Sequence, residues 1–328
     1  MKICFFAKVR DKALFKVVEF YKVDIEALRQ LGHEVICVNS FKELMLVRCD
    51  LYYIWWFGYG VFPALLAKLK GKPTILTGAV HTNDCGGLSD WPLHKRALMM
   101  MAMKLADRNL FISLTDFAKL GTFRPSCSEI AYCAVDVGIY TPDNAIPRKD
   151  LIVTITHLTK ENVARKMLME SIEAFALFSR QHPTFQYHIC GSFGDAVDDV
   201  RAKIQECGIE DKVVLRGRIS DEDKVIALRS ARAYLQPSTC EGFGLAILEA
   251  KACGMPVVTN AEPCIVEING DSVLYGESIQ EWSDGLARLS DDSAFFDEMR
   301  LKGLENVSRY TAVARRAVID KVIGSLGI

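Results

Sequence analysis

The chain is organised around one stretch of its second half, which reads Pro237-Ser238-Thr239-Cys240-Glu241-Gly242-Phe243-Gly244-Leu245-Ala246-Ile247-Leu248-Glu249-Ala250. The apolar residues 233–236 before it predict a short buried strand, and apolar residues at helical spacing after it predict a helix that ends at Gly254. Gly242 and Gly244 therefore fall where a strand turns into a helix. Such a turn lets the backbone approach a ligand closely and points free helix N–H groups at it, which suits a diphosphate.

Two carboxylates, Glu241 and Glu249, accompany these glycines with seven residues between them. Because carboxylates are poor ligands for phosphate, we interpret them as acceptors for sugar hydroxyls. The pair resembles the E-x7-E motif of retaining glycosyltransferases of the GT-B fold, and family 4 in particular. Residues 249–258 resemble the E-A-x-A-x-G-x-P-V-V run of the same family. The alternative is an ordinary strand–turn–helix in which a glutamate caps the helix.

The composition is that of a globular enzyme, with 328 residues, half of them hydrophobic, and a formal net charge of −1. This length accommodates two α/β domains, and the balanced charge gives no bulk field that would attract nucleic acid. The eleven cysteines form no C-x-x-C pair, which favours core thiols in a reducing compartment over a disulfide framework. No apolar run is long enough to cross a bilayer and the N-terminus does not resemble a signal peptide, so we expect a cytoplasmic protein.

Strands and helices alternate along the chain, which predicts an α/β fold with doubly wound parallel sheets. A polar, proline-containing stretch at 142–150 separates the halves, and residues 134–142 resemble the linker of the family. We therefore expect Rossmann-like domains over 1–146 and 147–309 and a C-terminal helix within 310–328. The resemblance implies that the two domains face each other across a cleft and bind the acceptor and the nucleotide sugar respectively. It also implies that the last helix crosses back to the first domain.

The same pattern places the individual elements. The expected strands are 3–6, 34–38, 51–55, 73–76, 110–113, 130–132, 151–156, 185–190, 213–215, 233–236 and 256–259. The expected helices include 16–31, 62–70, 93–106, 166–182, 195–207 and 221–230. Ser220 and Asp223 form an N-cap pair for the last of these, which explains the acidic run 221–223 better than a metal-binding D-x-D does.

Transfer of a sugar from a nucleoside diphosphate requires that the departing diphosphate be stabilised, which fixed cations and helix N-termini can do without a metal. The resemblance implies an Arg and a Lys after the first strand of the second domain, but Thr156-His157-Leu158 replaces the usual G-R-L there. Arg165 and Lys166, at the start of the next predicted helix, are the candidates that supply this charge, and Lys160 is a weaker one. A solvated basic helix face is the alternative.

The positions at which the resemblance implies donor contacts are Gly191, Arg218, Ile219, Glu241, Gly242, Phe243, Gly244, Leu245 and Glu249. Glu241 would hold the donor sugar, Glu249 the ribose hydroxyls, and the backbone of 242–245 the phosphates or the sugar. The backbone around Arg218 and Ile219 would contact the nucleobase, although Ile219 also fits a core position. For Gly191, at the end of a strand, an ordinary turn is the alternative.

The first domain offers a candidate of its own. His81 follows a strand in a polar segment and resembles the active-site histidine of the family, which contacts the donor sugar near the reacting carbon; a bland surface histidine is the alternative. The glycine-rich loop of the family is missing, because residues 7–12 contain no glycine, and their basic side chains could substitute by charge. The aromatic residues of 55–59 could stack on an acceptor sugar, with core packing for at least one tryptophan.

The helix expected over 93–106 carries Lys95, Arg96 and Lys104 beside four methionines. A basic amphipathic helix of this kind could rest on anionic lipid, as in relatives that glycosylate lipid acceptors. Buried methionines with a solvated basic edge explain the pattern as well. A peripheral contact with the inner face of a membrane is therefore one expectation.

These observations together predict a retaining, metal-independent glycosyltransferase without a cofactor, acting on a nucleotide-sugar donor and a glycan or lipid-linked acceptor, with no nucleic-acid partner. An NAD-dependent oxidoreductase would need G-x-G-x-x-G after a strand, and neither glycine pair completes that motif. A catalytically silent GT-B protein or partner subunit is the remaining alternative. The missing arginine and glycine-rich loop favour it, whereas the two retained glutamates argue against it.

Overall fold

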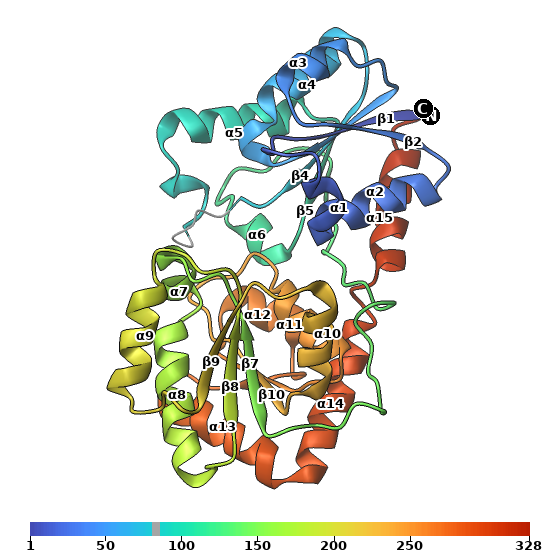
Figure 1. Cartoon of the computed structure of the whole chain (residues 1–328). Coiled ribbons are helices and arrows are strands. Elements are labelled where there is room, and N and C mark those ends of the chain that lie inside the picture. The colour runs from blue at the N-terminus through green and yellow to red at the C-terminus, as the bar shows by residue number, and fades with distance from the viewer. Residues whose placement is uncertain (81–85) are drawn as a thin grey trace. The chain divides into compact units, whose positions relative to one another are not determined.

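The computed structural model describes residues 1–80 and 86–328, which group into two compact units (Figure 1). The first unit comprises Met1–Ala134 together with Tyr310–Ile328, and the second comprises Val135–Arg309. The division falls earlier than the expected boundary at 146/147, because the segment after Val135 is bonded to the second unit. The Nε of Arg229, on helix α10 (Asp221–Ser230) of the second unit, donates to the Thr141 carbonyl over 2.8 Å, and this bond ties the linker segment to the second unit.

The first unit is built on a six-stranded parallel sheet in the order β2-β1-β3-β4-β5-β6. Its strands are β1 (Lys2–Ala7), β2 (Glu34–Val38), β3 (Leu51–Trp55), β4 (Thr74–Gly78), β5 (Arg108–Phe111) and β6 (Ser128–Ile130). Its helices are α1 (Leu14–Val17), α2 (Glu19–Gln30), α3 (Phe41–Leu46), η1 (Phe57–Tyr59), α4 (Val61–Leu69), η2 (Leu88–Asp90), α5 (Leu93–Leu105), α6 (Leu114–Ala118) and α15 (Ala312–Gly324). Every residue of β3 and β4 is buried, as expected of central strands covered on both faces.

The second unit repeats this plan with the strand order β12-β11-β10-β7-β8-β9, again with every pairing parallel. Its strands are β7 (Leu151–Ile155), β8 (Gln186–Cys190), β9 (Val213–Gly217), β10 (Ala233–Leu235), β11 (Val257–Thr259) and β12 (Leu274–Tyr275). Its helices are α7 (Lys160–Arg165), α8 (Leu168–Gln181), α9 (Val197–Glu206), α10 (Asp221–Ser230), α11 (Leu245–Ala252), α12 (Pro263–Asn269), α13 (Ile279–Asp291) and α14 (Ser293–Val307). The two parallel sheets confirm the predicted α/β fold.

The C-terminal helix α15 lies against α2 in the first unit. Arg315, from α15, is buried together with Asp24, from α2, and their side chains form an ion pair. A buried charge is stable only when it is paired and hydrogen-bonded, so this contact fixes how the end of the chain packs on the first unit.

Two predicted helices differ from those in the structure. The helix expected over 16–31 is split into α1 and α2, because Val18 takes an extended conformation. The helix expected over 166–182 begins at Leu168 instead, because Met167 has the left-handed φ of 43° and separates α8 from the short helix α7. Periodicity alone does not reveal either break, since the apolar spacing continues across both.

The parallel arrangement brings functional loops to one edge of the second sheet. All strands of a parallel sheet point the same way, so the loops that follow β7, β8, β10 and β11 leave from the same edge. The stretch that dominates the sequence, between β10 and α11, is one of these loops (Figure 1).

Candidate functional site

The loop between β10 and α11 is held by hydrogen bonds on both sides of Ser238. The Ser238 N–H donates to the Asn260 side-chain carbonyl over 2.8 Å, and the Asn260 amide donates back to the Ser238 carbonyl over 3.0 Å. Gly244 precedes α11 as its N-cap with φ of +80°, a left-handed conformation that an L side chain rarely adopts. The glycine is therefore required by the turn that opens the helix.

Glu241 is the best-connected carboxylate of this loop. Its side chain is only 8% exposed, and its Oε1 accepts hydrogen bonds from Gln236 Nε2 and Ser238 Oγ, each over 3.2 Å. The Lys166 Nζ lies 3.3 Å from the same oxygen and the Arg165 Nη1 lies 3.4 Å from it. A carboxylate is thus paired with two cations in a nearly water-free position.

These contacts perturb the titration of the group. Burial alone would raise the pKa of Glu241, but attraction to Lys166 and Arg165 outweighs burial and holds that pKa below its usual value. Burial also lowers the pKa of Lys166, against the opposing attraction of Glu241. A shifted pKa in a cluster of opposite charges is typical of functional sites as well as of structural ion pairs.

Arg165 and Lys166 do not start a helix, as the sequence predicts, but end one. Arg165 is the last residue of α7 and Lys166 is its C-cap, where positive charge is favourable because the helix dipole is negative at this end. The Arg165 Nη1 donates to the Cys240 carbonyl over 3.0 Å, and the Thr239 N–H donates to the Arg165 carbonyl over 2.8 Å. The end of α7 and the loop with Glu241 therefore form one rigid cluster. Lys160, at the other end of α7, is exposed.

The second glutamate of the motif occupies a different environment. Glu249 is 6% exposed on α11, and its Oε2 lies 2.6 Å from the Nζ of Lys224 on α10. The Nζ of Lys224 also lies 5.1 Å from the ring centroid of Tyr140. Sequence analysis did not identify Lys224, and the only signal for it was its place in α10, the helix that follows Arg218 and Ile219.

Gly191 follows β8 directly, where the carboxyl ends of β7, β8 and β9 lie close together. It has φ of +152°, and a Cβ at this position would lie 1.9 Å from the Thr156 carbonyl oxygen. Its N–H donates to the Gly217 carbonyl over 2.9 Å, while Thr156 N–H donates to the Cys190 carbonyl over 2.8 Å. Glycine is therefore required here by the close approach of β7, β8 and β9.

The remaining predicted donor residues differ in burial. Phe243 and Gly244 are buried, Gly242, Leu245 and Ile219 are half-buried, and Arg218 is exposed. His81 lies outside the described residues. The N-cap prediction for α10 is confirmed, because the Asp223 N–H donates to Ser220 Oγ over 3.0 Å.

The aromatic residues after β3 divide between core and surface. Trp55 is 2% exposed and donates its indole N–H to Asp24 Oδ2 over 2.9 Å, which gives it the core role expected of at least one tryptophan. Trp56 is half-buried and takes the left-handed φ of 82°, which is unusual for a bulky residue. Tyr59 is 52% exposed. In the loop that follows β1, the Lys12 Nζ lies 2.8 Å from the Glu43 Oε2.

No group of three or more His, Cys, Asp and Glu side chains among residues 1–80 and 86–328 is arranged to hold a metal ion. Within the same residues, every helix falls short of the length and apolar character that crossing a bilayer requires.

Solved structures share this architecture. The structure of Anabaena HepE in complex with UDP and glucose matches with a TM-score of 0.77 over 99% of this chain and 100% of that one, at 17% identity. The lipopolysaccharide outer core galactosyltransferase WaaB matches with a TM-score of 0.64 over 99% of both chains, at 16% identity. At such identities the likeness establishes the fold, and this chain has the GT-B fold.

Curated relatives match at the level of sequence. A D-inositol 3-phosphate glycosyltransferase of Arthrobacter is 28% identical over 47% of this chain and 40% of its own length. A GDP-mannose:cellobiosyl-diphosphopolyprenol alpha-mannosyltransferase of Xanthomonas oryzae is 29% identical over 81% of this chain and 71% of its own length. The chain spans 39% to 66% of the length of the first three curated relatives that it matches. The family model for glycosyl transferases group 1 matches residues 143–306, half of the 328-residue chain, and shows that the chain belongs to this family.

Proposed function

We propose that this chain is a retaining glycosyltransferase that moves a sugar from a nucleoside-diphosphate donor to a glycan or lipid-linked acceptor. The observation that carries the proposal is the cluster of Glu241, Lys166 and Arg165 beside the glycine turn that opens α11. Two fixed cations, a buried carboxylate and the N-terminus of a helix combine the features that a diphosphate leaving group and a sugar require.

Each group has a proposed role. Lys166 and Arg165 stabilise the negative charge that develops on the departing diphosphate, and Glu241 accepts hydrogen bonds from hydroxyls of the donor sugar. The backbone of 242–245 binds the phosphates or the sugar. Glu249 accepts hydrogen bonds from the ribose hydroxyls, in competition with Lys224, whose Nζ lies 2.6 Å from the Glu249 Oε2. In a retaining reaction on one face of the sugar, the departing phosphate itself can accept the proton of the acceptor hydroxyl.

Metal independence is part of this proposal. Positive charge from Lys166 and Arg165 is already present beside Glu241, so the protein supplies the electrostatic stabilisation that a divalent cation would otherwise provide. Activity is expected to persist after treatment with EDTA. A loss of turnover that added magnesium or manganese restores would contradict this part of the proposal.

The relatives suggest which donors to test. HepE was solved with UDP, and the Xanthomonas relative is named for GDP-mannose. The test is thermal shift and donor hydrolysis with UDP-, GDP- and ADP-sugars, using the wild type, Glu241→Gln and the control Glu222→Gln. Glu222 is exposed on α10, so its substitution makes the same change of charge outside the cluster.

Three outcomes separate the candidate functions. Stabilisation by one nucleotide series, with hydrolysis that Glu241→Gln abolishes and Glu222→Gln preserves, would support the transferase. Stabilisation without turnover, even in the presence of glycan and lipid-linked acceptors, would favour the catalytically silent GT-B protein. No response to any nucleotide sugar would contradict the donor site.

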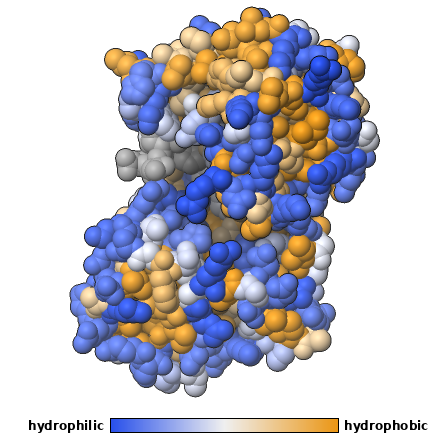
Figure 2. All heavy atoms as spheres, turned by 45° about the horizontal axis from the view of Figure 1, so that its top comes forward, coloured by the Kyte–Doolittle hydropathy of each residue, from blue (hydrophilic) through white to orange (hydrophobic). Residues whose placement is uncertain are grey.

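We also propose that the first unit contacts the inner, cytoplasmic face of a membrane, where a lipid-linked acceptor would be found. The surface of this unit carries extensive hydrophobic areas (Figure 2), and the exposed side chains include Met45 and Leu46 of α3 and Leu65 and Leu69 of α4. Leu65 and Leu69 are four residues apart and share one helix face. Exposed basic residues flank them, namely Lys42, Arg48, Lys68 and Lys70. Apolar side chains with basic neighbours suit an anionic lipid surface.

Helix α5, which the sequence suggested for this role, also presents exposed apolar side chains. In α5, Met99, Ala102 and Met103 are buried, as the core interpretation predicts, whereas Leu93, Leu98 and Met101 are exposed. Co-sedimentation with vesicles of anionic and of zwitterionic lipid tests the proposal. A double Leu65→Glu, Leu69→Glu variant is expected to lose binding to anionic vesicles, while Leu301→Glu, at an exposed leucine of α14, retains it. Equal binding by all three proteins would contradict it.

A further inference from the structure

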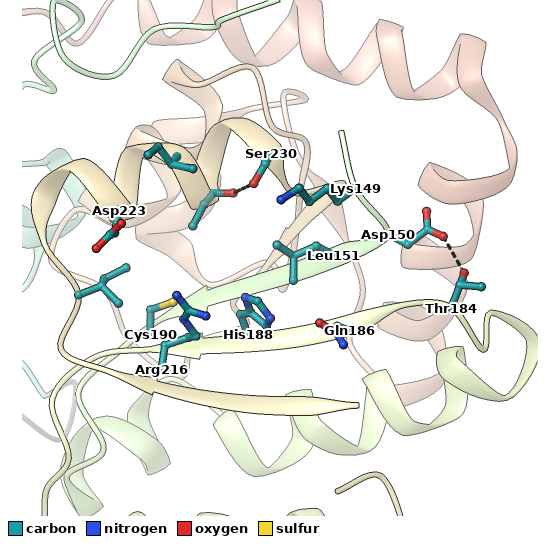
Figure 3. A pocket seen from close by; sticks show the side chains of 13 residues that line it. Lys149, Asp150, Leu151, Thr184, Gln186, His188, Cys190, Arg216, Asp223 and Ser230 are labelled. Carbon is teal, nitrogen blue, oxygen red and sulfur yellow. Dashed lines mark hydrogen bonds between the residues drawn. The ribbon is translucent and has the colours of Figure 1, made fainter. Parts of the chain in front are cut away.

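A pocket of about 410 Å³ lies on the second unit beside α10, over strands β7, β8 and β9 (Figure 3). Side chains alternate along β8, so that Tyr187 and Ile189 enter the core while Gln186, His188 and Cys190 face the pocket. The volume falls within the range that small-molecule sites occupy. The donor cluster around Glu241 does not contribute to this lining.

Three basic side chains enter the pocket from different segments. Lys149 comes from the residues before β7, His188 from β8 and Arg216 from β9, and the view of the pocket shows all three beside the same space (Figure 3). The pairing of β8 with β9 shifts register between Ile189 and Cys190, so that Arg216 falls at an irregularity of the sheet. Such irregularities redirect side chains out of the regular alternation.

Two carboxylates, Asp150 and Asp223, line the same pocket as the basic side chains, and each accepts a hydrogen bond from a hydroxyl. Asp150 accepts a hydrogen bond from Thr184 Oγ1 over 2.6 Å, and Asp223 accepts one from Ser220 Oγ over 3.0 Å. Among residues 1–80 and 86–328, no hydrogen bond or ion pair engages the side chains of Lys149, His188 or Arg216. Burial lowers the pKa of His188, and the nearby charges of Arg216 and Lys149 lower it further. A bound anion would act against these effects and raise that pKa.

We propose that this pocket binds a small organic phosphate, with the phosphate group between Arg216, His188 and Lys149. The apolar side chains of Ile219 and Ile226 would cover the carbon skeleton of the ligand. A phosphate monoester fits because it offers several acceptor oxygens to a guanidinium, an imidazole and an ammonium group at once. Sugar phosphates and nucleoside monophosphates share this chemistry. The pocket would bind such a ligand whether or not the chain transfers sugars.

The pocket also borders the proposed donor site. Ile219 belongs to both, and Cys190 is followed directly by Gly191. Helix α10 contributes Ile226 to the pocket, and its Lys224 contacts Glu249.

Isothermal titration calorimetry on the whole chain tests the site with inorganic phosphate, glucose 6-phosphate and uridine 5′-monophosphate at constant ionic strength. We expect saturable binding of at least one ester, tighter than that of inorganic phosphate, because only an ester contacts the apolar wall. Arg216→Gln is expected to weaken it about tenfold or more, since a charge-assisted hydrogen bond is lost. Arg216 is exposed, so this variant should fold normally.

Lys166→Met separates this site from the donor site. Ester binding that Arg216→Gln weakens and Lys166→Met preserves would support the pocket, as would an upward shift of the imidazole pKa of His188 on binding, measured by NMR. Binding that Lys166→Met abolishes and Arg216→Gln leaves intact would place the anion in the donor cluster and overturn the proposal. Absence of saturable binding by all three probes would overturn it as well, while leaving nucleotide-sugar binding untouched.

Discussion

Replacing Arg315 by methionine is expected to destabilise the first unit by about 3–5 kcal/mol. Its Nη2 donates to Asp24 Oδ2 over 2.9 Å, its Nε donates to Oδ1, and the two side chains are 1% and 0% exposed. The Tyr53 hydroxyl and the Trp55 indole N–H also donate to Oδ2, each over 2.9 Å. Among residues 1–80 and 86–328, Arg315 is the only cation paired with this carboxylate, so in the variant Asp24 keeps only the neutral donors Tyr53 and Trp55, both on Oδ2.

The expected magnitude follows from this geometry. Removing one partner of a buried ion pair leaves an uncompensated charge, which costs about 3–5 kcal/mol against a total stability of about 5–15 kcal/mol. For a unit of this size, each kcal/mol lowers the melting temperature by about 2–4 °C, so the variant should melt about 6–20 °C lower. Arg315 also donates to the Tyr132 carbonyl over 3.0 Å, and the loss of that bond acts in the same direction.

Unfolding followed by tryptophan fluorescence measures this effect, because Trp55, Trp56 and Trp91 belong to the first unit and only one of the four tryptophans belongs to the second. The matched control is Arg316→Met on the same helix. Arg316 donates to the side chain of Gln30 at an exposed position, so its loss should change stability by no more than about 0.5 kcal/mol.

A double-mutant cycle gives the decisive comparison. Asp24→Asn combined with Arg315→Met removes the buried charge as well as its partner, so the double variant should be more stable than the sum of the single effects implies. The reasoning is refuted if Arg315→Met costs less than about 1 kcal/mol, or if it costs no more than Arg316→Met.

Three further predictions concern the second unit. Lys166→Met should lower kcat about 10²–10³-fold, because it removes the positive charge that stabilises the leaving group. The control Lys160→Met, at an exposed lysine of α7, should leave kcat unchanged. Equal effects of the two substitutions in steady-state assays would contradict the role of Lys166. Burial lowers the pKa of Lys251 to about 7. Between about pH 7 and 10 the unfolded chain therefore binds more protons than the native one. The free energy of unfolding should rise with pH over this range, by up to about 1.4 kcal/mol per pH unit. Denaturation curves of Lys251→Met should lack this rise, and an unchanged slope would argue against the low pKa. Gly191→Ala should lower the melting temperature more than Gly208→Ala does. Both glycines have positive φ, but of the two only Gly191 would bring a Cβ against a backbone carbonyl. Equal losses would show that the space at Gly191 is not limiting.

The local sequence predicted most of the fold, because strands and helices form in response to short-range patterns of residues. Apolar runs between turn signals indicated parallel strands, and the strands found at β2 and β3 and the helix found at α10 have the predicted bounds. The run from 237 to 258 indicated the family, because its glycines, glutamates and prolines match the motif of that family, and the family model confirms the assignment. Helices α12, α13 and α14 were not placed by this reasoning.

The environment of the candidate site came only from the tertiary structure. The sequence predicted Arg165 and Lys166 as donor-site residues, but it placed them at the start of a helix, whereas in the structure α7 ends at Arg165 and the left-handed residue Met167 follows the pair that contacts Glu241. Such a break leaves no mark in hydrophobic periodicity. Likewise, Lys224 is one of many surface-like lysines until the sheet order brings α10 beside α11.

The sequence by itself indicated two α/β units and the loop that holds the candidate site, because strand and helix formation and glycine turns depend on neighbouring residues. Tertiary structure alone decided which charges meet. Asp24 and Arg315 are 291 residues apart, and the three basic side chains of the pocket beside α10 come from three separate segments. Electrostatic contacts of this kind depend on distance in space, which the order of residues along the chain does not specify.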